Sequence, residues 1–228
     1  MVMTPRKKRY IIAAIIGSIA VSFALYNAAI SFPYKTTKLW NFDQYQVNSL
    51  PDIFSAAQIG TGNPGKWAIV SDPSAPSPPN VLAKISVPRS GSDYSLLGVS
   101  DSPTVGNARV SVMFKLISNA TNDASAGLVI RLQDSSHYFV LMADSYNSRF
   151  SFCRADTGKI LCTEDKNADI AIGQWHNITA DVSTQGVAGY LDGNLLLQRY
   201  DAHYQDGQIG LWTKGDSQVY FDNLQIQY

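Results

Sequence analysis

The sequence predicts an all-β protein, an antiparallel sandwich or barrel preceded by one N-terminal transmembrane helix. Two observations predict the β domain: short runs in which apolar and polar side chains alternate, and turn residues at hairpin spacing between those runs. A third observation, an uncharged stretch from Ile11 to Phe32, predicts the helix. The composition agrees, because 45% hydrophobic, 11% aromatic and only 16% charged residues exclude a disordered chain.

The first 38 residues differ from the remainder. Arg6 to Arg9 are four consecutive basic residues directly before the uncharged stretch, whose 22 residues would span roughly 33 Å as a helix, enough for a bilayer core of about 30 Å. The basic cluster predicts a cytoplasmic N-terminus and an exported remainder. We therefore predict a basic stub, a transmembrane signal anchor and a tether over residues 1–38. The alternative is a signal peptide cleaved after Ala24, which would leave a secreted protein.

Residues 39–228 show no helical periodicity and are predicted to form a single β domain. Strict alternation marks four strands, which are Val110–Leu116, Leu128–Leu132, Phe139–Ala143 and Ile178–Val182. Tight turns are predicted at Asp134-Ser135-Ser136, Tyr146-Asn147, Thr157-Gly158 and Asp192-Gly193-Asn194. Residues 60–80 are rich in Pro, which cannot donate to a strand ladder, so we expect a long ordered loop around a short strand at Trp67–Val70.

The two cysteines flank one of the predicted hairpins. With Thr157-Gly158 as a two-residue turn, Cys153 lies opposite Cys162 in a non-hydrogen-bonded pair, and that geometry accepts a disulfide. Export would place the pair in an oxidising compartment. We predict a Cys153–Cys162 disulfide, with two buried free thiols as the alternative.

The zero net charge hides an uneven distribution of charged residues. After residue 24 there are 14 basic against 18 acidic residues, a net charge of −4. No basic stripe remains for a nucleic-acid partner. Asp165, Asn167 and Asp169 have the first spacings of a calcium loop, but Ile170 and His176 stand where Gly and Glu are needed, so we assign no site to them.

Several segments resemble concanavalin A-like (LamG-type) jelly-roll domains, and most closely the branch named 3-keto-disaccharide hydrolase or domain of unknown function. The segments are Asn63–Trp67, Asp72–Pro76, Pro79–Ala83, Ala126–Arg131, Tyr138–Val140, Gln174–Asn177, Tyr190–Gly193, Gly210–Ser217 and Tyr220–Leu224. The resemblance covers nearly all of residues 39–228. It implies a jelly-roll β-sandwich in which one sheet often carries a ligand.

Strand pairing indicates which residues would form that ligand face. Two-residue turns put the polar members of neighbouring strands together on one mixed face, opposite to the apolar members. An exposed Trp would offer a flat surface to a sugar ring. The predicted ligand-binding residues are Arg131, Gln133, Tyr138, Asp144, Trp175 and Lys214. The alternative is an ordinary solvated sheet surface.

The acidic residues argue against the usual hydrolytic chemistry of this fold. Its retaining glycosidases use a strand motif with two Glu residues, about 5 Å apart, whereas Glu164 is the only Glu in this chain. We therefore predict an extracytoplasmic glycan- or surface-binding module that is not an enzyme. The alternatives are a hydrolase or lyase acting on 3-keto-disaccharide glycosides, which would need one base and an oxyanion stabiliser, and a structural envelope domain that binds protein.

The resemblance also implies a structural calcium ion. Related jelly rolls hold one with an Asp on the final strand and with backbone carbonyls near the N-terminal strand. Asp222 stands at the matching place, and Asp43 is the candidate second ligand. The alternative is an Asp that pairs locally with a turn.

Overall fold

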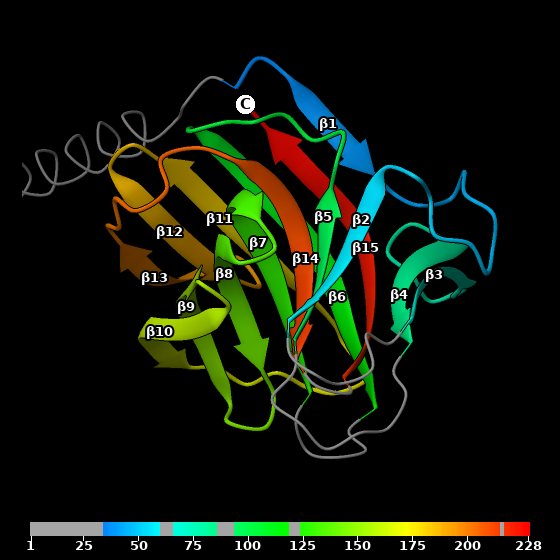
Figure 1. Cartoon of the computed structure of the whole chain (residues 1–228). Coiled ribbons are helices and arrows are strands. Elements are labelled where there is room, and N and C mark those ends of the chain that lie inside the picture. The colour runs from blue at the N-terminus through cyan, green and yellow to red at the C-terminus, as the bar shows by residue number, and fades with distance from the viewer. Residues whose placement is uncertain (1–33, 60–65, 86–93, 119–123, 215–216) are drawn as a thin grey trace, which may run out of the picture. The chain divides into compact units, whose positions relative to one another are not determined.

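The computed structural model describes residues 34–59, 66–85, 94–118, 124–214 and 217–228 (Figure 1). The chain divides into two compact units, Met1–Lys35 and Thr36–Tyr228. The predicted anchor over residues 11–32 lies outside the described residues and stays a prediction. In the part that is described, there is no helix of the length and apolarity needed to cross a membrane.

Two antiparallel sheets build the second unit (Figure 1). One sheet has eight strands in the order β13-β12-β11-β6-β15-β4-β3, with β1 pairing with β15, and the other has seven in the order β10-β9-β8-β7-β14-β5-β2. The strands of the eight-stranded sheet are β1 (Thr37–Trp40), β3 (Lys66–Ser71), β4 (Asn80–Ile85), β6 (Ala108–Ser118), β11 (Trp175–Ser183), β12 (Gly186–Leu191), β13 (Asn194–Arg199) and β15 (Gln218–Gln227). Those of the seven-stranded sheet are β2 (Phe54–Ile59), β5 (Tyr94–Val99), β7 (Ser125–Asp134), β8 (His137–Asp144), β9 (Arg149–Asp156), β10 (Lys159–Asn167) and β14 (Gln208–Lys214). The predicted β-sandwich is therefore confirmed.

The main core lies between the sheets and contains the apolar residues that the alternation placed inward. All of the following are buried in it: Val110, Val112, Phe114, Leu116, Leu128, Ile130, Phe139, Leu141, Ala143, Ile178, Ala180 and Val182. Because successive side chains of a strand point to opposite faces, one apolar face per strand was enough to fill this layer.

Leu132 was predicted in this core and lies elsewhere. The pairing of β7 with β8 shifts between Ile130 and Asp134, where Arg131 has a φ of 50°. Such a bulge adds a residue to one strand and reverses the faces that follow it. Leu132 packs instead against a second apolar group, the outer cluster, which consists of Leu96, Val129, Tyr138, Val140, Cys153, Ala155 and Trp212.

The hairpin turns and the disulfide agree with the sequence-based expectations. Thr157 and Gly158 have φ of 51° and 78°, and Asp192 and Gly193 have 50° and 78°, the positive values that a two-residue hairpin turn requires. Cys153 and Cys162 are directly opposite in the register and form the predicted disulfide. The β8–β9 connection is longer than predicted, because it takes the four residues between Asp144 and Arg149.

The Pro-rich segment between β3 and β4 packs on the outside of the eight-stranded sheet. The Lys115 ammonium pairs with the Asp72 carboxylate and donates to the Ser74 hydroxyl, and the Trp175 indole donates to the Ser74 carbonyl at 3.0 Å. The same ammonium lies 4.9 Å from the Trp175 ring centre and 5.5 Å from that of Tyr220. These contacts attach the segment, in agreement with the predicted ordered loop; residues 60–65 of that prediction lie outside the described residues.

Candidate ligand-binding pocket

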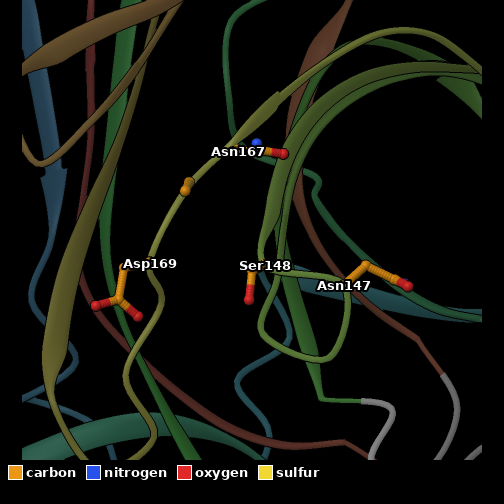
Figure 2. Close-up of a pocket in the computed structure, with 5 residues that line it drawn as sticks. Asn147, Ser148, Asn167 and Asp169 are labelled. Carbon is orange, nitrogen blue, oxygen red and sulfur yellow. The ribbon is translucent and has the colours of Figure 1, made fainter.

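An open pocket of about 550 Å³ lies where the β8–β9 turn meets the segment that follows β10 (Figure 2). Asn147 and Ser148 line it from the turn, Asn167 from the end of β10, and Ala168 and Asp169 from the segment that follows. Four of the five lining side chains are an amide, a hydroxyl or a carboxylate. The pocket therefore offers hydrogen-bond donors and acceptors beside apolar surface.

The turn side of the pocket is held by Asp144. This residue is only 3% exposed, and its Oδ1 accepts the backbone N–H groups of Tyr146 and Asn147 at 3.0 and 3.1 Å. Its Oδ2 accepts the Asn147 side-chain amide at 2.8 Å. A short polar side chain that bonds the backbone two and three residues ahead favours this turn. Ser148 then adopts a φ of 50°, a left-handed conformation that is costly for most residues other than Gly.

The segment side is held by three contacts. The Ala168 N–H donates to the Ser148 carbonyl at 2.9 Å, which extends the β9–β10 ladder by one bond. Ile170 is buried in the main core. The His176 Nε2 accepts the Ala171 N–H at 3.1 Å, while its Nδ1 lies 2.8 Å from Asp192. Both walls of the pocket are therefore attached to the sandwich.

Arg131 and Gln133, predicted to bind ligand, contact backbone carbonyls of the protein itself. The Arg131 guanidinium is buried and donates to the carbonyls of Tyr204 and Ser183, each at 2.7 Å. Burial lowers the pKa of Arg131, and the nearby Asp201 and Asp206 oppose that shift. The Gln133 amide donates to the Asp206 carbonyl at 2.5 Å.

The other predicted ligand residues lie in separate places. Tyr138 is fully buried in the outer cluster, and burial raises the pKa of its hydroxyl. Lys214 ends β14 opposite Tyr94, Asp144 supports the pocket turn, and Trp175 lies on the other sheet. The structure does not bring the six residues into one site, and their role in ligand binding stays a prediction.

Asp43 and Asp222, the predicted calcium ligands, are brought together by Ser77. The Ser77 N–H donates to Asp222 Oδ2 at 2.7 Å and its hydroxyl donates to Asp43 Oδ2 at 3.1 Å. Asp222 is fully buried, and burial raises its pKa to about 6, with the charges of Asp43 and Asp72 adding to the shift and the N–H groups of Ser77 and Asn223 opposing it.

This pair fits a calcium ion in part. Two carboxylates held close together in a buried place favour a nearby cation. Both carboxylates already accept N–H groups, however, Asp43 from Asn41 and Asn80, and Asp222 from Ser77 and Asn223. Across the described ranges, no three His, Cys, Asp or Glu side chains are grouped to hold a metal. An ion here would need backbone or amide oxygens as further ligands, and the calcium site stays a prediction.

Sequence reasoning considered Asn167 and Asp169 only in a calcium loop that it rejected, and it missed the pocket, although a signal for the pocket was present. The hairpin of β9 and β10 that pairs Cys153 with Cys162 also brings its open end together, so that Arg149 lies opposite Asn167. Extending that register by one step joins Ser148 to Ala168. Carrying the hairpin to its open end would have placed the two polar segments side by side.

Comparisons with known proteins define the fold. No family model and no curated protein matches the sequence. Among solved structures, the carbohydrate-binding module CBM66 from Bacillus subtilis matches with a TM-score of 0.60 and 15% identity over 78% of this chain and 98% of its own. The cellulose induced protein Cip1 matches with a TM-score of 0.60 and 14% identity over 83% and 96%. A Bacteroides ovatus GH16 protein matches with a TM-score of 0.56 and 9% identity over 83% and 98%.

The likenesses show the fold alone, a two-sheet β-sandwich, which is the fold that the resemblance to concanavalin A-like domains predicted. They do not distinguish its branches, so membership of the 3-keto-disaccharide hydrolase branch stays a prediction.

Proposed function

We propose that the sandwich is an extracytoplasmic carbohydrate-binding module, held at the membrane through residues 11–32 and without catalytic activity. The observation that carries the proposal is the open pocket of about 550 Å³ with its amide, hydroxyl and carboxylate lining. Sugars present many hydroxyl groups, and these are the partners such a lining would bind. Tyr146, 61% exposed on the same turn, offers the apolar face of its ring to a sugar.

The fold is consistent with carbohydrate binding but is not by itself an argument for it. One structure of similar fold is named a carbohydrate-binding module, and another is described in complex with a glucan product. The same fold hosts different functions, so the argument rests on the pocket. A glycosidase needs two carboxyl groups across the scissile bond, whereas Asp169 is the one carboxylate among the described residues that line the pocket. This supports binding rather than hydrolysis by the two-carboxylate mechanism.

Saturation-transfer NMR on residues 36–228 tests the proposal, since this range forms one compact unit. The ligand panel contains neutral disaccharides, 3-keto-disaccharides and cell-envelope glycans. Saturation transfer without new resonances is expected. Product resonances from a keto-sugar would instead favour the hydrolase or lyase alternative, and no transfer from any sugar would overturn the proposal.

Two variants, each lacking one side-chain amide, test whether the sugar contacts the pocket. Asn167→Ala removes a lining side chain and should weaken the transfer, whereas Gln198→Ala on the exposed face of β13 should leave it unchanged. Equal transfer in both variants would place the sugar elsewhere on the sandwich.

A further inference from the structure

Asp169 gives the pocket a negative charge. It is the one charged side chain that lines the pocket among the described residues, and it is exposed at the pocket wall (Figure 2). Its carboxylate takes part in none of the hydrogen bonds or ion pairs of the described residues, so its oxygens remain available to a ligand.

The surroundings do not cancel this charge. Arg149, which follows Ser148 in the chain, is paired with the Asp165 carboxylate. Lys166 precedes the lining segment and does not line the pocket. Behind the turn, the buried Asp144 adds a second negative charge, whose oxygens face backbone and side-chain N–H groups. A cationic group entering the pocket therefore meets a negative potential, and an anionic group is repelled.

Ser148 adds a hydroxyl at an unfavourable backbone position. Its φ of 50° lies in the left-handed region, where Gly is preferred and a side chain carries a cost of about 1 kcal/mol or more. Figure 2 shows its side chain between those of Asn147 and Asp169. The turn that Asp144 holds accounts for this conformation. None of the hydrogen bonds of the described residues involves the Ser148 hydroxyl, so it is available to a ligand beside the Asp169 carboxylate.

We infer that the pocket selects amine-bearing sugars, with the Asp169 carboxylate accepting from the ammonium and the Ser148 hydroxyl bonding a neighbouring sugar hydroxyl. The inference rests on the proposed carbohydrate binding and names the ligand class of the same pocket. A charge-assisted hydrogen bond is stronger than a neutral one. Acidic sugars such as uronates would bind least, because their carboxylate would face Asp169.

Affinities for three related probes test the inference: a glucosamine disaccharide, its N-acetylated form, and a disaccharide that contains glucuronic acid. Isothermal titration at pH 6 and low salt should show the amine form binding about fivefold more tightly than the N-acetylated form, the size expected for an exposed charge pair. The acidic disaccharide should bind most weakly. The preference should shrink in high salt, because exposed charges are screened.

Asp169→Asn keeps the shape of the side chain and removes its charge. The variant should lose the preference for the amine, with little change for the N-acetylated sugar. Asp52→Asn is the matched control, since it makes the same charge change before β2, at the far edge of the seven-stranded sheet. The control should keep the preference of the original protein.

Ser148→Gly distinguishes the effect of the Ser148 hydroxyl on ligand affinity from its effect on the stability of the fold. Gly relieves the left-handed strain, so the variant should unfold at the same temperature or higher, while its affinity for the amine sugar falls severalfold. An unchanged affinity would remove Ser148 from the site.

The outcomes also distinguish a failure of the proposed ligand class from a failure of carbohydrate binding itself. Equal binding of the amine and N-acetylated sugars, or a preference that survives Asp169→Asn, overturns the ligand class and leaves carbohydrate binding in place. Binding of no sugar at all overturns the proposed function itself.

Discussion

Arg131 shows that a polar residue predicted on the mixed face of a strand can be part of the fold. Its guanidinium is buried and donates to the carbonyls of Ser183 and Tyr204, so it joins β7 to the end of β11 and to the β13–β14 connection. Arg131→Ala should lower the free energy of unfolding by about 2–3 kcal/mol, because two partly buried carbonyls lose charged donors. Urea denaturation measures this. Arg199→Ala on the exposed side of β13 is the control and should cost less than about 0.5 kcal/mol, and equal losses would contradict the structural role.

Asp222 makes the stability depend on pH. Its pKa in the folded protein is about 6, against an ordinary 3.8, so between these values the folded state holds a proton that the unfolded state has released. Stability should therefore fall as the pH rises through that window, by at most about 3 kcal/mol. Thermal unfolding in EDTA at pH 4.5 and pH 7.5 measures the fall, and Asp222→Asn should reduce it.

Calcium offers a second test of the same residue. If Asp43 and Asp222 hold the ion, added calcium should raise the unfolding temperature at pH 7.5, and EDTA should reverse the effect. The effect should disappear in Asp222→Asn. No response to calcium in the original protein would leave the pair as a local hydrogen-bonded contact with Ser77.

At the scale of single elements, β10 depends on the Cys153–Cys162 disulfide. β10 is an edge strand that pairs only with β9 in the sheet, and most of its residues are exposed. Replacing both cysteines by Ser should cost about 2 kcal/mol, since the closed loop is short. Hydrogen exchange should become faster in β10 and stay slow in β6 and β15.

The same variant should also weaken sugar binding, because β10 leads directly into Asn167 and Asp169 of the pocket. Uniformly faster exchange in all strands would mean that the disulfide supports the whole sandwich rather than one edge. Unchanged binding would show that the contacts of Ala168 and Ile170 hold the segment without it.

For the whole molecule, the prediction concerns the membrane. The full chain should sediment with membranes and resist extraction at alkaline pH, while residues 36–228 alone should stay in solution, because the uncharged stretch lies within residues 11–32. Mass spectrometry of the mature protein distinguishes the alternatives. A chain that retains residues 1–24 supports the anchor, and a chain that begins at Leu25 supports a cleaved signal peptide.

The sequence by itself determined the sandwich, most of its core and the disulfide. Alternation fixes which side of a strand is apolar, and the two turn residues Thr157 and Gly158 set the register that places Cys153 opposite Cys162. These features are local, since each depends on residues within one strand or one hairpin. Leu132 was misplaced for a local reason too, because nothing in the strand pattern marks the bulge at Arg131.

Only the tertiary structure decided which polar residues are free to meet a ligand. Arg131 and Asp169 are both charged residues, yet Arg131 is buried against backbone carbonyls and Asp169 faces an open pocket. The difference arises from connections distant in the sequence, such as Ser183 and Tyr204, which supply acceptors to Arg131. The hydrogen-bond partners of a polar group depend on all the residues packed around it. The alternation within one strand shows only on which of its two faces a residue lies.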